Sequence, residues 1–434
     1  MAKGKSRIHR PLLSGDTRAT MDCLRALGVS IEEGSEEGSE EGSETIDVDS
    51  PGITGWKKPD APLNAGNSGT TARFLMGVLS ACPGMQASII GDASLSRRPM
   101  RRVLDLLHRA GAPEASHETG EAEQASEKSL PVTIRGAHLQ PFDVQSAVGS
   151  AQIKTAMIFA ALTCDGESRV TLPDGSRNHT EILCAKLGLP VTASRGGGLE
   201  TITIHGPADI RPFEVTIPGD PSSASFLVAA GILSGQGIMI RGVCGNPLRS
   251  AFIDVLDQAG LTVQRTPVAG KNFTEAVEDW SVSPSSQSRL AIRPAGEIPA
   301  AWAPAIIDEI PVLAVVLAFA PGASVFRGVG ELRFKESDRL AATVELLQQA
   351  GCEAVAEGDD LLIAGGLKPA TIKPFEFDPK GDHRLAMAAM VLEFVAQKAC
   401  TILDRSCVEV SFPDFTAVLS SVDSKHSKKR GLLS

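Results

Sequence analysis

At 434 residues, 42% of them hydrophobic, the chain is long enough for two or three domains with buried cores. A formal net charge of −10 argues against nucleic acid as the main partner. No run reaches the roughly 20 apolar residues that a bilayer requires, so no membrane role is expected. The eight cysteines form no CxxC pair, and no signal peptide is recognised, so we expect a reducing cytoplasmic setting without a zinc or redox motif.

The first predicted helix covers residues 21–28, with Asp16 as its N-cap. Its apolar residues from Met21 to Leu27 recur every third position, and the following glycine can take the left-handed conformation that ends a helix. The same amphipathic pattern ending in glycine returns at residues 102–111, 181–188, 252–260 and 343–351, and a weaker amphipathic segment without that glycine follows at 412–422.

Helices of a second kind open with small polar or acidic residues and continue as small apolar residues. They are expected in the segments that begin at Gly66, Gly149, Gly219, Asp308 and Asp382. A helix that is apolar on every side is usually buried. Strands should follow most of the amphipathic helices, as at residues 261–264. The chain is therefore predicted to be an α/β protein built from repeats, with inner helices and outer sheets, in two lobes at residues 1–216 and 217–434.

One segment interrupts this repeat pattern. The tract from Glu32 to Glu44 carries seven glutamates in a four-residue repeat and has no apolar residue to bury. Such a composition is typical of a solvated loop. The polar stretch at residues 117–129 is interpreted in the same way.

Polar residues concentrate where the buried helices begin. Helix N-termini present free N–H groups, so several such openings could bind one multiply anionic ligand. Arginines and lysines nearby strengthen this interpretation, since the arginine fork suits phosphate and carboxylate. Two acids lie among these cations, Asp308 and Glu336; they could form structural ion pairs or an acid–base pair, and His383 could do similar work.

A family resemblance then becomes specific. The segments NSGTTAR, SLSRRPM, SAQIKTA, SRNHTE, PGDPSSASF, DEIPVLAV, RFKESDRLAA, DHRLAMA and SFPDF, in that order, resemble bacterial 5-enolpyruvylshikimate-3-phosphate (EPSP) synthases. The resemblance implies two similar domains, each of three βαβαββ-type units, that close over substrates. It implies transfer of the enolpyruvyl group of phosphoenolpyruvate to the 5-hydroxyl of shikimate 3-phosphate, by a monomer without metal or organic cofactor.

The resemblance also implies roles for individual residues. Asp308 would meet the 5-hydroxyl, Glu336 would protonate the methylene carbon, and Lys335 would contact shikimate 3-phosphate. Gly69 would leave room for glyphosate, which competes with phosphoenolpyruvate in sensitive members. Substrate binding is expected from Asn67, Gly69, Arg98, Ser150, Ala151, Gln152, Ser176, Arg177, Arg339, His383 and Arg384.

The beginning of the chain departs from the family pattern. The family opens with a PGDKSxSHR loop before a small-apolar helix, and Lys5, Ser6 and Arg10 in KSRIHR imitate its spacing. The residues that follow resemble family sequence from beyond that helix, so we expect the catalytic lysine loop and the first buried helix to be missing. A catalytically impaired homologue is therefore an alternative function. UDP-N-acetylglucosamine enolpyruvyl transferase is a second alternative, although Ala93 stands where that family usually has a reactive cysteine.

Overall fold

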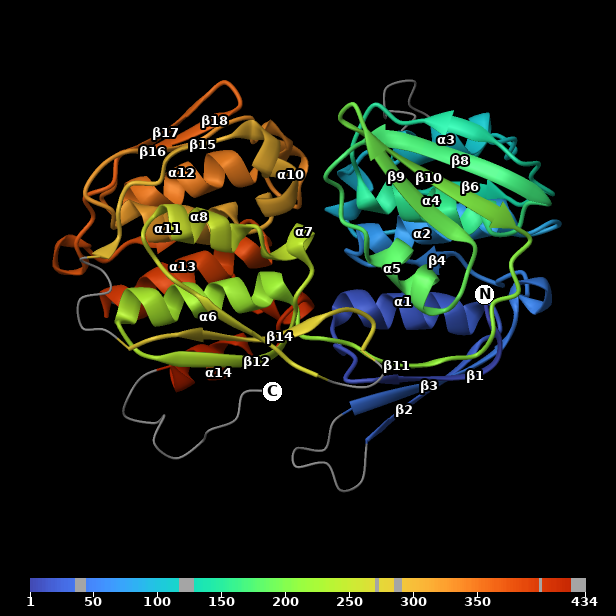
Figure 1. The fold of residues 1–434 in the computed structure, drawn as a ribbon, viewed down its shortest axis with the longest axis horizontal. Helices are drawn as coiled ribbons and strands as arrows, with labels where there is room; N and C mark the ends of the chain where they lie inside the picture. Colours follow the sequence, from blue (N-terminus) through green and yellow to red (C-terminus); the bar gives the residue numbers. More distant parts are fainter. Residues whose placement is uncertain (36–43, 117–128, 270–272, 285–290, 398–399, 423–434) are drawn as a thin grey trace. The chain divides into compact units, whose positions relative to one another are not determined.

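The computed structural model describes residues 1–35, 44–116, 129–269, 273–284, 291–397 and 400–422 (Figure 1). The chain divides into two compact units. Unit 1 comprises Met1–Ile217 with Asn272–Thr274, and unit 2 comprises Pro218–Lys271 with Glu275–Ser434.

All six amphipathic helices predicted from the sequence are present. They are α1 (Gly15–Ala26), α3 (Arg101–Arg109), α5 (His179–Lys186), α8 (Phe252–Gln258), α12 (Arg339–Gln349) and α14 (Phe415–Ser421). The predicted N-cap of α1 is wrong: Ser14 precedes the helix, and its backbone N–H donates to Thr17 Oγ1 at 2.9 Å. Asp16 lies instead in the first turn, where a negative charge still favours the helix dipole.

The five small-apolar helices are also confirmed and are mostly buried. They are α2 (Gly69–Ser80), α4 (Ala151–Ala161), α6 (Pro221–Ser234), α11 (Ile310–Ala318) and α13 (His383–Ala396). Glycine permits close packing between α2 and α4, because a Cβ on Gly77 would overlap the carbonyl oxygen of Ala156. Phe74 and Phe159 meet edge-on across the same helix pair, with ring centroids 5.4 Å apart.

Three sheets belong to unit 1. The first has the order β11 (Glu214–Thr216), β1 (Lys3–His9), β3 (Glu44–Pro51) and β2 (Ser30–Ser35). The second has β4 (Leu63–Asn64), β5 (Gln86–Ile90) and β6 (Val132–Arg135). The third has β7 (Asp143–Gln145), β8 (Gly166–Pro173), β10 (Leu199–Gly206) and β9 (Val191–Gly196).

Three further sheets belong to unit 2. Their orders are β12 (Ile238–Cys244), β14 (Val277–Val282) and β13 (Gln264–Pro267); β15 (Gly296–Ile298), β16 (Ser324–Phe326), β18 (Asp360–Ile363) and β17 (Ala354–Glu357); and β19 (Glu376–Phe377) with β20 (Thr401–Ile402). The strand expected at residues 261–264 begins only at Gln264; Leu261 and Val263, which precede it, are buried in the core.

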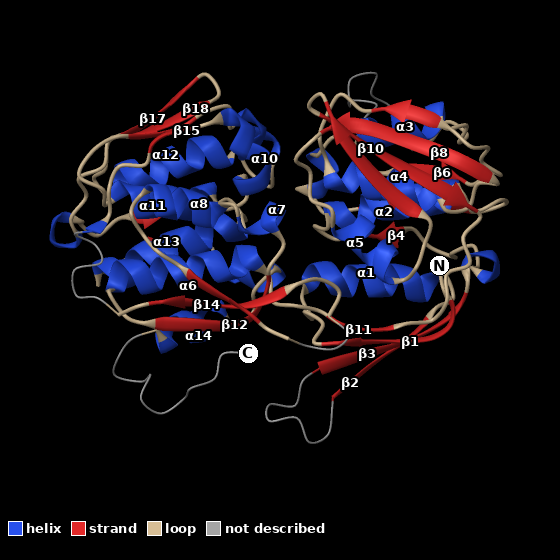
Figure 2. Cartoon of the chain, viewed as in Figure 1, coloured by secondary structure: helices blue, strands red, loops and turns tan. Residues whose placement is uncertain are grey.

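The same βαβαββ order appears in both units. In unit 1 it runs β7, α4, β8, α5, β9 and β10; in unit 2 it runs β15, α11, β16, α12, β17 and β18. In each case the first two strands are parallel and the others antiparallel. Within each unit the sheets lie outside the helices (Figure 2).

The first repeat lacks a small-apolar helix in the described residues. Strand β1 leads directly to α1, as expected if residues 11–28 correspond to family sequence from beyond that helix. Strand β11 pairs parallel with β1. The acidic tract is not wholly a loop, because Glu32–Ser35 and Glu44 belong to β2 and β3. The rest of the tract, and residues 117–128 of the second polar stretch, lie outside the described residues.

Shorter helices complete the described chain. They are η1 (Ile53–Gly55), η2 (Leu95–Arg97), α7 (Pro247–Ser250), η3 (Ala300–Trp302), α10 (Ala303–Ile306), η4 (Gly330–Phe334), η5 (Pro369–Thr371) and η6 (Ser406–Val410). Among the described residues, no single helix has the length and apolar composition to cross a membrane; one pair, Ala300–Ile306 with Ile310–Ala318, would qualify together but is bent by 113°.

Candidate active site

The predicted site residues fall into two sets, one in each unit. Unit 1 holds Asn67, Gly69, Arg98, Ser150, Ala151, Gln152, Ser176 and Arg177, and unit 2 holds Asp308, Lys335, Glu336, Arg339, His383 and Arg384. The two sets are described separately below.

In unit 1, polar contacts hold the residues in front of α2. The Arg98 guanidinium donates through Nη2 to Asn67 Oδ1 at 2.6 Å, and Asn67 Nδ2 donates to Asp92 Oδ2 at 2.7 Å. Ser68 Oγ caps the helix by accepting from the backbone N–H of Thr71 at 3.2 Å. Asn67 and Arg98 are thus brought together beside a helix N-terminus, an arrangement suited to an anion.

Arg73 joins the openings of α2 and α4. Its Nη1 donates to Gln152 Oε1 at 2.6 Å, and Gln152 Nε2 donates to Thr70 Oγ1 at 2.8 Å. Arg73 is absent from the predicted site, although its spacing four residues after Gly69 places both on one helix face. A Cβ on Gly69 would lie 2.6 Å from Arg73 Nη1, so the absence of a side chain at Gly69 gives the Arg73 guanidinium the space that it occupies.

The remaining residues of the unit 1 set lie at the opening of α4 and after β8. Ser150 precedes α4 and forms no capping hydrogen bond within the described chain, and Ala151 is its first helical residue. Ser176 and Arg177 lie in the loop between β8 and α5. The Ser176 hydroxyl is buried and has no hydrogen-bond partner among the described residues, so it is available to a ligand.

In unit 2, Arg339 is the centre of the set. It is only 1% exposed and donates to three carboxylates: Nε to Asp382 Oδ2 at 2.8 Å, Nη1 to Asp308 Oδ1 at 3.0 Å and Nη2 to Glu336 Oε2 at 2.5 Å. Burial of the guanidinium opposes its charge, but these carboxylates outweigh burial and raise the pKa of Arg339 above its usual value.

Asp308 is also contacted by several cationic side chains. Lys335 Nζ donates to Asp308 Oδ1 at 3.3 Å, and Arg384 Nη1 donates to the Asp308 carbonyl oxygen at 3.3 Å. The sequence placed Asp308 at the start of a helix, but α11 begins at Ile310 with Glu309 as the N-cap. Asp308 lies in the turn before α11, where its side chain reaches α12 as well as the segment preceding it.

Asp382 is a site residue that the sequence argument missed. It is fully buried, its Oδ1 caps α13 by accepting from Arg384 N–H at 3.0 Å, and its Oδ2 accepts from Arg339 and from Ser337 Oγ. The DHR segment was noted for His383 and Arg384, but an N-cap acid next to them was the available signal. Burial, with help from the charges of Arg384 and Arg339, lowers the pKa of His383 to about 4, so this ring is neutral near pH 7.

Further polar contacts support the Asp308 turn from the opening of α6. Arg249 Nη2 donates to Asp220 Oδ1 at 2.5 Å and to Ser222 Oγ at 2.9 Å, and Ser222 donates to Glu309. The charges of Arg249 and Arg384, with hydrogen bonds from Ser223, hold the pKa of Asp220 below its usual range. The segment PGDPSS was noticed in the sequence, whereas Arg249 and Glu309 were not.

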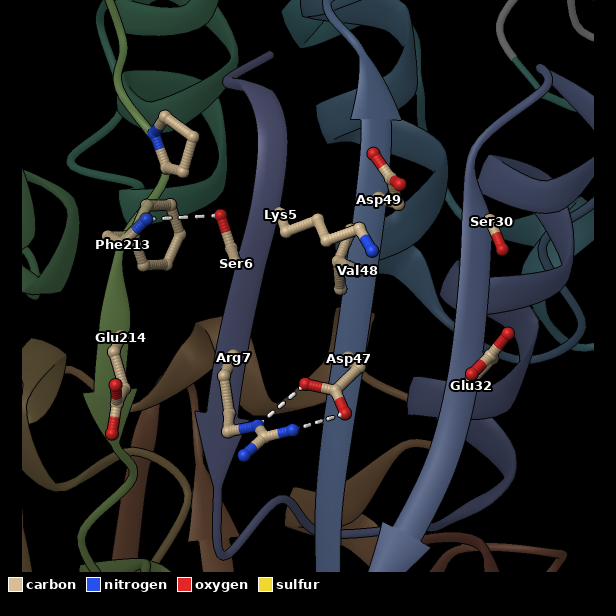
Figure 3. Close-up of a pocket in the computed structure, with 11 residues that line it drawn as sticks. Lys5, Ser6, Arg7, Ser30, Glu32, Asp47, Val48, Asp49, Phe213 and Glu214 are labelled. Carbon is tan, nitrogen blue, oxygen red and sulfur yellow. Dashed lines mark hydrogen bonds and ion pairs between the residues drawn. The ribbon is translucent and has the colours of Figure 1, made fainter.

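A surface cavity of about 590 Å³ lies elsewhere, on the sheet of β1, β2, β3 and β11 (Figure 3). Lys5, Ser6 and Arg7 line it from β1, and none of the predicted site residues does. Ser6 Oγ accepts from Phe213 N–H at 3.1 Å, and Arg7 forms an ion pair with Asp47 at 2.7 Å. Lys5 and Ser6 are therefore residues of strand β1 and do not lie in a loop at the opening of a small-apolar helix, where the family resemblance would place them.

Comparison with known proteins identifies the relationship. The sequence model of EPSP synthase (3-phosphoshikimate 1-carboxyvinyltransferase) matches residues 1–419. The chain belongs to the EPSP synthase family. A relative in Acidiphilium cryptum, named 3-phosphoshikimate 1-carboxyvinyltransferase, is 38% identical over 426 residues, covering 97% of this chain and 89% of the relative. A relative of the same name in Gluconobacter oxydans is also 38% identical, over 97% of this chain and 90% of its own length.

Solved structures agree with this family. The EPSP synthase of Acinetobacter baumannii superposes with a TM-score of 0.77 at 30% identity, covering 97% of this chain and 91% of that chain. The enolpyruvyl transferase NikO from Streptomyces tendae, at 18% identity and a TM-score of 0.68, shares the fold. The predicted family, fold class and enzyme class are therefore confirmed. The relatives' names support the EPSP synthase interpretation and give no support to the UDP-N-acetylglucosamine alternative.

Proposed function

We propose that this EPSP synthase family member transfers the enolpyruvyl group of phosphoenolpyruvate to the 5-hydroxyl of shikimate 3-phosphate and releases inorganic phosphate. The oxygen of the 5-hydroxyl bonds to C2 of phosphoenolpyruvate while C3 gains a proton. The resulting tetrahedral adduct then loses phosphate from C2 and a proton from C3, which restores the double bond.

Asp308, Lys335 and Glu336 are proposed to carry out the proton transfers. Asp308 accepts the hydroxyl proton; its carboxylate is held in place by Lys335 Nζ at 3.3 Å and by Arg339 Nη1 at 3.0 Å. Lys335 also binds the phosphorylated shikimate. Glu336 delivers and removes the proton at C3; its carboxylate is held by Arg339 at 2.5 Å.

Substrate binding is divided between the two sets. Ser150, Ala151, Gln152, Ser176 and Arg177 are proposed to bind shikimate 3-phosphate. Asn67, Gly69 and Arg98 of unit 1, with Arg339, His383 and Arg384 of unit 2, are proposed to bind phosphoenolpyruvate. Its phosphate and carboxylate suit the fixed donors at helix openings, which cost little reorganisation when negative charge develops in the reaction.

The observation that carries this proposal is the arrangement around Asp308. Arg339 and Arg384 lie far from Asp308 in the sequence, yet each donates a hydrogen bond to it. Arg339 donates to its carboxylate and Arg384 to its carbonyl oxygen. Such a cluster of buried acids and cations provides both an acid–base group and anion-binding charge. An ordinary surface salt bridge would be exposed and would contribute little.

The test is phosphate release from phosphoenolpyruvate with shikimate 3-phosphate as acceptor, with the enolpyruvyl ether product identified by NMR. Shikimate and UDP-N-acetylglucosamine replace the acceptor as controls and should give no product. Binding of shikimate 3-phosphate without phosphate release would support the impaired homologue instead. Ser176→Ala should raise the KM for shikimate 3-phosphate without lowering the Tm, because its hydroxyl has no partner among the described residues.

The finer statements of the sequence argument stay predictions. We infer that lobes at residues 1–216 and 217–434 each supply part of the binding set, and that the enzyme is a cytoplasmic monomer that works without cofactor, nucleic acid or membrane. Size-exclusion chromatography with light scattering tests the monomer, and assay after chelator treatment tests the metal-free reaction.

A further inference from the structure

Helix α4 carries a fully buried lysine. Lys154 has no exposed surface, and its Nζ forms ion pairs with Glu181 Oε1 at 2.6 Å and with Glu200 Oε2 at 2.8 Å. Glu181 belongs to α5 and Glu200 to β10, so one ammonium group joins three elements of unit 1. Buried charges persist only when paired and hydrogen-bonded, so this cluster needs every contact that it has.

The third contact of Lys154 reaches the proposed substrate site. Its Nζ donates to the carbonyl oxygen of Ser176 at 3.4 Å. Nζ thus donates hydrogen bonds to Glu200 Oε2 and to this carbonyl oxygen, while Glu181 contributes charge through its ion pair. Lys154 therefore connects the opening turn of α4, three residues after Ala151, to the loop that carries Ser176 and Arg177.

A second cation, Arg195, also contacts Glu200 and holds the loop between β8 and α5. Arg195 Nη2 donates to Glu200 Oε1 at 3.0 Å, and Arg195 Nε pairs with Asp174 Oδ1 at 3.1 Å. Glu200 is fully buried and so fixes both cations. The loop is thus anchored at Asp174 by Arg195 and at Ser176 by Lys154.

We propose that Lys154, held by Glu181 and Glu200, is a positioning residue that sets the Ser176 hydroxyl against the opening of α4 for binding phosphorylated shikimate. This inference rests on the proposed function. Lys154 is assigned no ligand contact, because its ammonium group is already paired with Glu181 and Glu200 and donates to the Ser176 carbonyl oxygen. The Ser176 hydroxyl is buried and unpartnered in the described chain, so its position is determined by the backbone that Lys154 holds.

Removal of Lys154 alone would leave Glu181 and Glu200 facing each other without their shared cation. Burial already raises the pKa of Glu181 above its usual value, despite the opposing effect of Lys154. Lys154→Met is therefore expected to destabilise the fold as well as the loop. The double variant Lys154→Met/Glu181→Gln removes the excess negative charge and leaves the Arg195–Glu200 and Arg195–Asp174 pairs in place.

A matched control exists one residue along the same helix. Thr155 Oγ1 lies 2.5 Å from Thr180 Oγ1 and so also joins α4 to α5, without contacting Ser176 in the described structure. Thr155→Val breaks this contact and tests whether any loosening of the two helices affects substrate binding.

The experiment measures KM for both substrates, kcat and Tm in the full chain. The double variant should raise KM for shikimate 3-phosphate roughly tenfold, the equivalent of about 1.4 kcal/mol, while KM for phosphoenolpyruvate and kcat change less than about threefold. Thr155→Val should lower Tm and leave both KM values unchanged. An unchanged KM for shikimate 3-phosphate in the folded double variant overturns the proposal, as does an equal rise in Thr155→Val.

Two further outcomes are decisive. If neither Lys154 variant folds, Lys154 is a structural residue and the positioning role is wrong. If the unmodified chain itself forms no product, the proposed function fails. If the unmodified chain is active but the KM for shikimate 3-phosphate is the same with and without Lys154, only the positioning role fails.

Discussion

The two units hold their arginines in different ways. In unit 1, Arg98 donates to the amide oxygen of Asn67, and Arg73 donates to the amide oxygen of Gln152 and to the carbonyl oxygen of Pro99. In unit 2, Arg339 donates to three carboxylates. A neutral acceptor orients a guanidinium without cancelling its charge, whereas three carboxylates more than cancel it.

This difference teaches how one family can combine anion binding with acid–base chemistry. In unit 1 these hydrogen bonds orient two guanidinium groups at helix openings through amide and backbone oxygens, which suits a phosphate site. The unit 2 arrangement fixes the carboxyl groups of Asp308 and Glu336 beside cations, and positioned groups of this kind are what proton transfer requires. Five substitutions test this contrast.

The largest effect is expected from Asp308→Ala, which removes the acid that Lys335 and Arg339 share. We expect kcat to fall about a thousandfold or more, because a positioned acid–base group contributes about 10² to 10⁴ in rate. KM for phosphoenolpyruvate should change far less. Steady-state phosphate release checks this, and equal losses in kcat and in phosphoenolpyruvate binding would mean that Asp308 only positions ligand.

Arg339→Met should lower stability most. It leaves Asp382, Asp308 and Glu336 without their common cation, and breaking a buried ion pair costs about 3 to 5 kcal/mol. Urea unfolding measures the loss. The unit 1 counterpart Arg98→Met should cost much less, since the acceptor of Arg98 on Asn67 is neutral; similar losses would remove the contrast between the units.

The neutral state of His383 gives the third effect. The folded pKa of about 4 lies below the ordinary value of about 6.5, so the unfolded chain binds the proton first as the pH falls. Stability associated with His383 is present above pH 6.5 and is lost between about pH 6.5 and 4, by up to about 3 kcal/mol. His383→Gln should therefore lose less stability over this interval in urea titrations; an unchanged pH dependence would contradict a neutral, half-buried ring.

The smallest change tests unit 1. In Gly69→Ala the new Cβ would lie 2.6 Å from Arg73 Nη1, so the guanidinium that donates to Gln152 must shift, and we expect this hydrogen bond to be lost. Loss of one charged hydrogen bond corresponds to about 1.5 to 3 kcal/mol, so KM for phosphoenolpyruvate should rise at least about tenfold. The unmodified enzyme should be inhibited by glyphosate and the variant relieved; inhibition unchanged by the substitution would show that Arg73 adapts without consequence.

Local patterns predicted much of this fold because helix signals are local. Small-apolar segments such as the one after Asp308 had to be buried, and each amphipathic segment had only one face to bury. One error concerned a purely local contact, and the other occurred where a neighbour in space decided the structure. Ser14 rather than Asp16 caps α1, and Glu32 and Glu33 became strand residues because β3 pairs with them.

The site divides in the same manner. The sequence by itself determined which residue types gather at helix openings, and so Asp308, Arg339 and Arg384 could be named. Only the tertiary structure decided that Asp382 joins them, that Arg73 reaches Gln152, and that Lys154 lies between Glu181 and Glu200. The physical reason is that a side chain's chemistry belongs to its residue, whereas its charge state and partners depend on groups that other segments bring within about 4 Å.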